Sequence, residues 1–314
     1  MKILLVAILL GAQTVDPIFR FETDGFWLNL HHFLYVLGRA EAKIADAKRE
    51  AVAGAPADEA AGLATLSEDE RRVWREAVGF YAGDLSKRDA VFDGELVGVT
   101  NALRRAPAEA SASTVKIAPA VAAALDRAAP LYRRAWWPQH HEANRTWVQS
   151  MQDPLKRYGP QMLAYVTRVY QEPWVTGGYP VNLSAWSNWA GAYSTSGSLL
   201  VVSSRSAGNQ GLHGLEITFH EAMHQWDEEI DGRLMRIAKE NNLKFNDLLS
   251  HAMIFYTTGE AMRSVLPSHV PYAEIAGIWK GRMGAFKPAL DNHWRPYLDG
   301  KTTLDAALLA LQQQ

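Results

Sequence analysis

The sequence predicts an α+β protein that is mostly helical, with a small sheet in its second half. Apolar residues recur at helical spacing through the first half of the chain, and again from about residue 212 to the end. After Pro173 come short runs rich in β-branched and aromatic residues, separated by glycine and serine. We therefore expect a helical region over residues 14–172 and a region of sheet and helix over 173–314, packed as one compact unit.

The composition sets limits on the class of protein. The chain has 314 residues, 48% of them hydrophobic and 21% charged, with a net charge of −2. This length can form one large domain or two ordinary ones, and the charge balance gives no reason to expect nucleic acid as a partner. The sequence contains no cysteine, so any bound metal must be held by His, Asp or Glu.

The N-terminus is typical of a secretory signal. One lysine precedes an unbroken apolar run, Ile3 to Leu10, which small residues follow. The run is far shorter than the roughly 20 apolar residues that cross a membrane. We expect residues 1–13 to be a signal peptide and the protein to be secreted or periplasmic, although a buried strand or helix start would also fit the run.

Helical periodicity identifies the elements of the first half. The expected helices cover residues 26–52, 67–81, 86–104, 117–134, 138–158 and 160–170. Pro138 and Pro160 suit first helical positions. The Ala/Pro-rich stretches 53–62 and 105–112 are too short for domain linkers, so we expect loops there.

Strands are expected in GGYPVNLSAW, NWAGAYSTSG and SLLVVSS. Many of the eleven tryptophans fall between the last helices of the first half and these strands. Most of them are expected to form the junction between two lobes, and a platform that stacks on a sugar or peptide is the alternative.

The stretch TFHEAMHQW, residues 218–226, carries the main chemical signal. Residues four apart lie on one face of a helix, so His220 and His224 can chelate one ion, and Glu221 reaches the side where a bound water lies. Ten histidines and 34 acidic residues give at most about 0.03 chance matches to H-E-x-x-H. We therefore predict a metal site, with zinc as the metal.

A catalytic zinc site needs a third protein ligand. Position 230, where a third histidine could stand, is isoleucine. Glu260 falls on the stripe of Leu249, Met253 and Tyr256, where a carboxylate on an apolar face needs a partner, so Glu260 is the predicted third ligand. His251 lies half a turn from Glu260, which predicts a place in the core or behind the ligands. Tyr256 is a candidate to hydrogen-bond an oxyanion.

These motifs resemble those of the gluzincins, zinc peptidases whose ligands are two histidines of H-E-x-x-H and a glutamate on a following helix. The resemblance implies a zincin-like lobe over 173–314, with His220, His224 and Glu260 as ligands and Glu221 as general base. It also implies an edge strand, with Ala190, Gly191 and Ala192 pairing with substrate. WAGAYSTSG, FHEAMH and HWRPYLDGKTTLDAAL also resemble a group of exported bacterial proteins for which no substrate is established.

One position departs from the thermolysin-like pattern. Those enzymes carry an Asp one turn after the ligand Glu, to orient a zinc histidine, and this chain has Ser264 there. Asp227 or Glu228 can take over that role, because they lie on the stripes of His220 and His224. Of the remaining residues, Tyr272 and His293 are the ones expected to come nearest the metal.

The expected function is a zinc metallopeptidase that acts on a peptide or protein substrate. Three alternatives stay open. The protein could hydrolyse a non-peptide amide such as a cell-wall fragment, or it could bind a peptide or glycan and keep the zinc for stability. It could also be an enzyme inhibited by its helical first half, in which case trimming residues 14–130 would raise activity.

Overall fold

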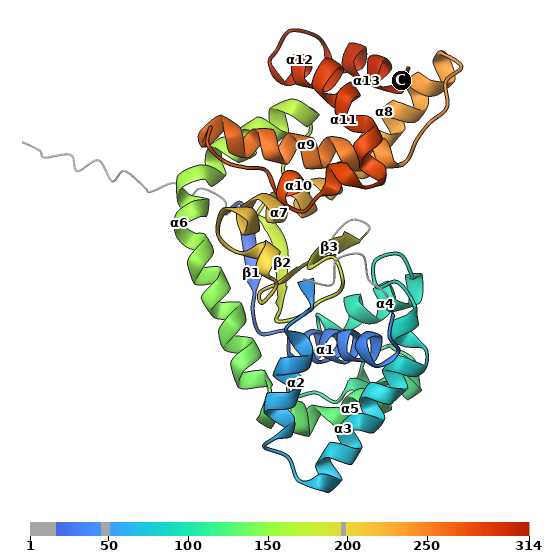
Figure 1. Cartoon of the computed structure of the whole chain (residues 1–314), viewed down its shortest axis with the longest axis vertical. Coiled ribbons are helices and arrows are strands. Elements are labelled where there is room, and N and C mark those ends of the chain that lie inside the picture. Colours follow the sequence, from blue (N-terminus) through green and yellow to red (C-terminus); the bar gives the residue numbers. More distant parts are fainter. Residues whose placement is uncertain (1–16, 45–50, 196–198, 314) are drawn as a thin grey trace, which may run out of the picture.

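The computed structural model describes residues 17–44, 51–195 and 199–313. A lower lobe of helices and an upper lobe of helices lie at opposite ends of a small sheet, and one long helix runs along both lobes (Figure 1). The expected α+β class, mostly helical, is confirmed. The predicted signal peptide, residues 1–13, lies outside the described residues.

The lower lobe surrounds one central helix. Its helices are α1 (Phe26–Glu41), α2 (Ala55–Leu63), α3 (Glu68–Gly83), α4 (Gly94–Leu103) and α5 (Pro119–Ala135). Every residue of α1 from Phe26 to Gly38 is buried. Trp74 and Trp136 stack in this core with their ring centroids 4.1 Å apart. The lower lobe therefore has a hydrophobic core of its own.

The sheet has four strands in the order β1-β2-β4-β3. Its strands are β1 (Phe19–Glu22), β2 (Tyr179–Ser184), β3 (Ala192–Thr195) and β4 (Leu199–Ser203). β1, β2 and β4 are parallel, and β3 pairs antiparallel with β4, so that β3 is an edge. His32 of α1 hydrogen-bonds Ser184 of β2 at 3.2 Å and the hydroxyl of Tyr193 in β3 at 2.8 Å. The lower lobe thereby holds two strands of the sheet in place.

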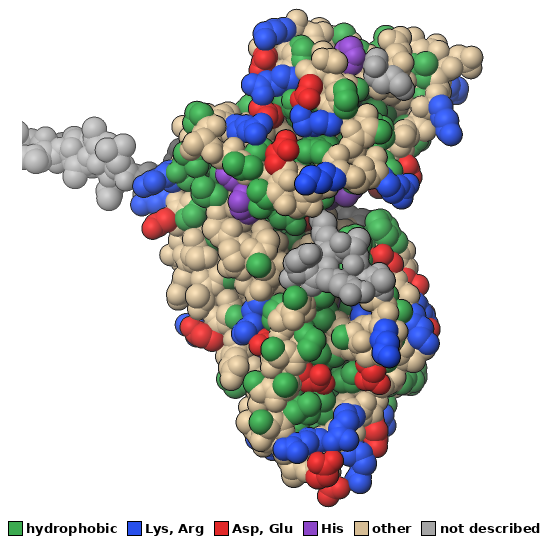
Figure 2. All heavy atoms as spheres, in the orientation of Figure 1, with side chains coloured by type: hydrophobic (Ala, Val, Ile, Leu, Met, Phe, Trp, Pro, Cys, Tyr) green, Lys and Arg blue, Asp and Glu red, His purple; other side chains and the backbone are tan. Residues whose placement is uncertain are grey.

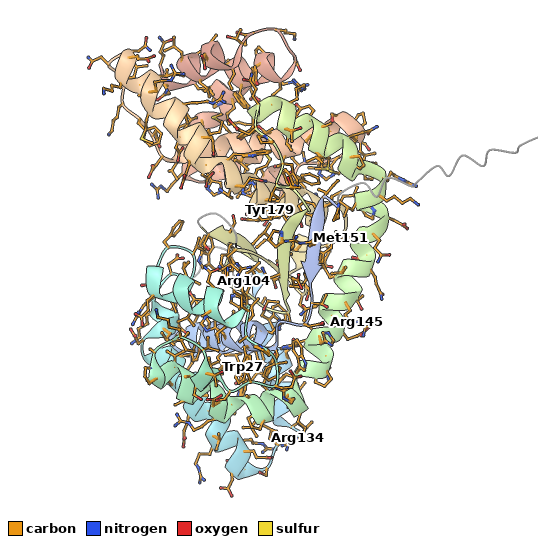
Figure 3. All side chains as sticks on the ribbon, turned by 180° about the vertical axis from the view of Figure 1, so that it is seen from behind. Trp27, Arg104, Arg134, Arg145, Met151 and Tyr179 are labelled. Atoms are coloured by element: carbon orange, nitrogen blue, oxygen red, sulfur yellow. The ribbon has the colours of Figure 1, made fainter. Side chains whose placement is uncertain are left out.

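Helix α6 (Trp137–Tyr170) connects the two lobes. Its 34 residues correspond to about 50 Å of α-helix. Seen from behind, Met151 of α6 lies beside the sheet, and Trp27 marks the lower lobe (Figure 3). Residues from Trp147 onward pack into the upper core, together with Phe19 of β1.

The upper lobe consists of helices that follow the sheet. They are α7 (Gly211–Met223), α8 (Asp227–Glu240), α9 (Leu248–Val265), α10 (Tyr272–Ile275), α11 (Lys287–Ala289), α12 (Arg295–Leu298) and α13 (Leu304–Gln312). A 3-10 turn, η5 (His224–Trp226), joins α7 to α8. In the space-filling view the outline narrows between the lobes, at the level of α9 and β3 (Figure 2). None of the described helices is both long enough and apolar enough to cross a membrane.

Three sequence-based expectations about the elements were wrong. The expected loop over 53–62 contains helix α2, for which Pro56 occupies an early helical position. The expected break at Pro160 is absent, and α6 continues through Pro154 and Pro160. Both ends of α6 pack against a hydrophobic core, which stabilises the helix across the two prolines. Strand β1 was not anticipated, since four residues are too few to show a periodicity.

The boundary between residues 172 and 173 does not separate two cores. Phe19 and the second half of α6 belong to the upper core, whereas Ala185 and Trp186 belong to the lower one. The two halves of the chain are therefore interleaved through the sheet. Trimming residues 14–130 would remove β1, α1 to α4 and most of α5, so it would disturb the sheet itself.

Candidate metal centre

The H-E-x-x-H stretch lies at the end of a helix that packs under the sheet. Leu215, Phe219 and Ala222 of α7 are buried in the upper core, which fixes the rotation of the helix. His220 is 1% exposed and Glu221 6% exposed. The local sequence pattern thus predicted the helix and its orientation correctly.

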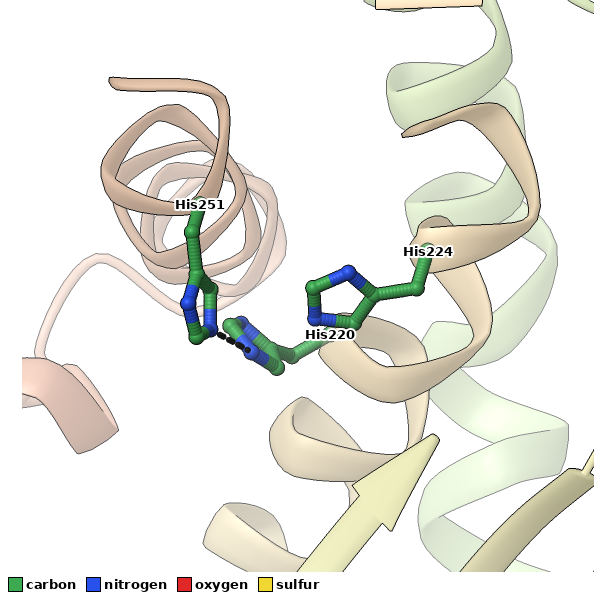
Figure 4. Close-up of side chains that lie close together, drawn as sticks. All are labelled: His220, His224 and His251. Atoms are coloured by element: carbon green, nitrogen blue, oxygen red, sulfur yellow. Dashed lines mark hydrogen bonds between the residues drawn. The ribbon is translucent and has the colours of Figure 1, made fainter. Parts of the chain in front are cut away.

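Three histidines meet between α7 and α9. Each of His220, His224 and His251 offers a ring nitrogen within 4.8 Å of the other two. The Nε2 atoms of His220 and His251 are 3.2 Å apart (Figure 4). His220 and His224 come from α7 and its end, and His251 projects from α9 toward them.

The donor set fits a metal ion. Two nitrogens bound tetrahedrally to zinc at about 2.0–2.1 Å lie roughly 3.3 Å apart, and the separation of His220 and His251 is close to that value. The contact is a hydrogen bond when one of the two nitrogens carries a proton, and a metal ion can take the place of that proton. Three histidine ligands with a further position open is an arrangement that catalytic zinc uses. The histidines can therefore hold a metal ion, whose identity the geometry leaves open.

Asp227 orients one of these histidines. Its carboxylate accepts a hydrogen bond from Nδ1 of His224, at 2.8 Å to Oδ2. Burial lowers the pKa of His224, but the hydrogen bond and the charges of Asp227 and Glu221 outweigh it and raise the pKa above its ordinary value. With its proton on Nδ1, His224 keeps the Nε2 lone pair for a metal. Of the two carboxylates considered from the sequence, Asp227 makes this contact and Glu228 is exposed.

Phe255 forms one wall of the centre. Its ring centroid lies 3.9 Å from that of His220 and 5.0 Å from that of His251. Because a packed aromatic ring limits the side-chain rotamers of its neighbours, Phe255 restricts both ligand candidates to their observed orientations.

Glu221 faces the edge strand. Its Oε2 accepts a hydrogen bond from Oγ of Ser194 in β3, at 2.9 Å. Two tyrosines lie within its electrostatic reach. Burial, and then the charge of Glu221, raises the pKa of Tyr179 and of Tyr272 to about 12. Both phenols therefore stay protonated at neutral pH and can act as hydrogen-bond donors.

Glu260 is not part of the histidine group. Its Oε1 accepts from Arg263 at 3.0 Å, and its Oε2 accepts from Arg295 of α12. His251 and Glu260 are nine positions apart, which is about two and a half helical turns, so they point to opposite sides of α9 and only one of them can face α7. In the structure His251 faces α7 and Glu260 does not, so the choice of Glu260 as third ligand stays a prediction that this placement does not favour.

Tyr256 also points away from the histidines. Its hydroxyl donates to Oδ1 of Asp291 at 2.8 Å, and Lys287 lies over its ring. Burial and the nearby Asp291 raise its pKa. The structure therefore does not bring Tyr256 to the histidines, since Tyr256 and Glu260 both lie on the face of α9 turned to the C-terminal helices.

The expected substrate strand begins later than the sequence suggested. Ala190 and Gly191 lie in the turn before β3, and Gly191 has a φ of +80°. The Gly191 carbonyl accepts from Ser203 N at 2.8 Å and from Asn209 Nδ2 at 3.0 Å. The carbonyl of Gly191 is thus hydrogen-bonded within the fold. Of the three predicted residues only Ala192 belongs to the edge strand.

A second group of histidines and a carboxylate lies one turn earlier on α7. His213, Glu216 and His269 bring their ligand atoms within 4.8 Å of one another. Here Nε2 of His269 donates to Oε2 of Glu216 at 2.7 Å. No sequence pattern predicted this group, because His269 approaches from the loop after α9.

Comparison with known proteins adds no assignment. Searches against protein-family models, curated proteins and solved structures gave no match.

Proposed function

We propose that the protein is a zinc-dependent hydrolase that cleaves peptide bonds. The observation that supports this most strongly is the convergence of His220, His224 and His251 beside the buried carboxylate of Glu221. Catalytic zinc sites combine three protein ligands with an open position, and a nearby carboxylate serves as general base. With His251 as the third ligand, the ligand set differs from that of the gluzincins, whose third ligand is a glutamate.

When bound, zinc would supply Lewis-acid activation of a water molecule and of the substrate carbonyl. His220, His224 and His251 would hold the ion, and Asp227 keeps His224 in the tautomer that can bind it. Glu221 accepts the proton of the attacking water and passes it to the leaving amine. Ser194 donates a hydrogen bond to one oxygen of Glu221 and so helps to orient the carboxylate.

The edge strand supports a peptide as substrate. Among the described strands β3 pairs only with β4, and it carries Ser194, the residue that contacts Glu221. An extended peptide that pairs with an open strand edge would place its backbone carbonyls along that edge. The pairing would therefore bring a scissile amide close to Glu221.

Replacement of Glu221 by Gln tests the proposal, with elemental analysis and hydrolysis of fluorescein-labelled casein as the measurements. We expect about one zinc per chain in both proteins and a loss of turnover of about 10²–10⁴-fold in Glu221→Gln. Full activity in that variant would exclude Glu221 as the base. A wild type that binds zinc, is stabilised by it and hydrolyses no casein, peptide or N-acylated cell-wall fragment would favour a binding protein instead.

A further inference from the structure

Strand β3 is held from both of its faces by side chains of the two lobes. Tyr193 and Ser194 are neighbours on this strand, so their side chains point to opposite faces of the sheet. The Tyr193 hydroxyl hydrogen-bonds Nε2 of His32 in α1 at 2.8 Å, and the Ser194 hydroxyl donates to Glu221 of α7 at 2.9 Å. β3 therefore connects the lower lobe to the helix that carries Glu221 (Figure 1).

The direction of the hydrogen bonds around His32 follows from the hydrogens that are available. The Ser184 hydroxyl donates its one hydrogen to the carbonyl of Trp186 at 2.6 Å, so toward Nδ1 of His32, at 3.2 Å, it can only accept. Burial, and then the charge of His31, lowers the pKa of His32 well below its ordinary value, so the ring is neutral with a single N–H. Its Nε2 is therefore an acceptor, and the Tyr193 hydroxyl is the donor.

This contact is buried and lies apart from the two large cores. His32 is 0% exposed and Tyr193 is 3% exposed, so an imidazole nitrogen that lost this donor would stay unsatisfied. Tyr193 packs with Leu199 and Val201 in a small cluster of its own. β3 has four residues, and among the described strands it pairs only with β4. So short a strand with one partner has few backbone hydrogen bonds, and its position depends on side-chain contacts.

We propose that His32 and Tyr193 are positioning residues for Glu221, because they hold β3 where Ser194 meets the carboxylate. This inference rests on the proposed hydrolase function. Both side chains lie on the face of β3 turned away from Glu221, so they act through the strand and do not contact the reacting atoms. The helical first half of the chain then supports the metal centre and does not inhibit it.

Tyr193→Phe tests the proposal, with Tyr81→Phe as its matched control. The Tyr81 hydroxyl hydrogen-bonds Nδ1 of His31 at 2.9 Å, in a buried contact of the same kind that joins α3 to α1 and does not involve β3. Both variants should lower the urea midpoint of unfolding, because each removes the hydroxyl partner of a buried imidazole.

Turnover separates the two variants. With zinc-loaded full-length protein and labelled casein, we expect kcat to fall about 10-fold in Tyr193→Phe and less than about twofold in Tyr81→Phe. An equal kcat in the two variants would mean that the contact between Tyr193 and His32 only stabilises the fold, and it would overturn the proposal.

A double-mutant cycle with Ser194→Ala tests the route through the strand. Since Tyr193 acts through Ser194, Ser194→Ala alone should also lower kcat about 10-fold. In the Ser194→Ala background, Tyr193→Phe should change kcat less than about twofold. Multiplicative losses, or an unchanged kcat in Ser194→Ala, would overturn the proposal.

Two measurements are independent of turnover. Hydrogen exchange at the backbone amides of β3 should be about 10-fold faster in Tyr193→Phe and less than about twofold faster in Tyr81→Phe, because an edge strand exchanges through local opening. Equal exchange in the two variants would contradict the positioning role. Each variant should bind as much zinc as the wild type. Loss of zinc in Tyr193→Phe would mean that the contact supports the ligands and not Glu221, which would also overturn the proposal.

The same measurements distinguish this inference from the proposed function. A wild type that hydrolyses nothing would remove the proposed function, and with it the role in catalysis. The amide exchange would still report whether His32 and Tyr193 hold β3 in position.

Discussion

Two histidine-containing groups lie along the same helix, and they differ in how their polar atoms are satisfied. At the end of α7, the three ligand atoms that come together are nitrogens of His220, His224 and His251, and the Asp227 carboxylate contacts the other nitrogen of His224. One turn earlier, Glu216 supplies acceptors for His269 and for a backbone N–H. Proximity of ligand-type residues is common to both, so proximity alone does not identify a metal site.

The difference shows which observation is informative. Two nitrogens that face each other at 3.2 Å require a shared proton or a cation. A carboxylate that accepts a hydrogen bond from an N–H already has its partner and needs no cation. Both groups meet the same distance criterion for a metal ion. We expect the first group to bind the ion and the second to hold the loop. Three pairs of variants test this division.

The largest effect is expected from His251→Ala, with Glu260→Gln as its matched control on the same helix. A protein zinc site contributes about 10–16 kcal/mol of apparent binding free energy, so loss of one of three ligands should weaken zinc binding at least about 100-fold. Glu260→Gln should bind zinc as the wild type does, because its carboxylate pairs with Arg263 and Arg295. Competition with a chromophoric chelator measures the zinc affinity of both variants. The reverse result would restore Glu260 as the ligand.

An intermediate effect is expected from Asp227→Asn, compared with Glu228→Gln. Asp227 fixes the tautomer of His224, and removal of such a partner reduces metal affinity about 10–100-fold. Glu228 is exposed, so its variant should change zinc affinity less than about twofold. Equal affinities in the two variants would mean that the contact between Asp227 and His224 does not support the metal.

The smallest effect concerns the loop held by Glu216. Gly259→Ala places a methyl group against Pro271 and should lower the free energy of unfolding by about 1–3 kcal/mol. Gly232 of α8 has no neighbour within 4 Å of a built Cβ, so Gly232→Ala should instead stabilise the helix by about 0.4–1 kcal/mol. Urea unfolding measures the free energy of unfolding of both variants. A change of the same sign in the two variants would contradict the close packing of α9 on this loop.

The sequence was sufficient to predict the part of the metal centre that lies within one short segment, and insufficient to predict the contacts that distant segments make with it. His220, Glu221 and His224 lie within one helical turn and a half, so their spacing alone predicts their common face. The choice between His251 and Glu260 required knowledge of which face of α9 turns toward α7. Almost every residue of α9 from Leu249 to Met262 is buried, so apolar periodicity could not distinguish the faces.

Contacts between residues far apart in the sequence could not be predicted either. Arg295, which pairs with Glu260, lies 35 residues downstream, and its approach depends on how the C-terminal helices fold back. Ser194 reaches Glu221 only because β3 lies against α7. By contrast, strands β2, β3 and β4 were predictable, because glycine and serine separate them and their composition is strongly β-forming.

The position of β1 has a consequence for the order of folding. Residues 19–22 pair with residues 179–182, so the first strand to leave the ribosome cannot join the sheet until about 160 more residues have been made. At about 5–20 residues per second, this delay is about 8–30 s. The lower lobe, with its own hydrophobic core, can collapse during that time. We therefore expect the metal centre to assemble last, after synthesis has passed the histidine of α9.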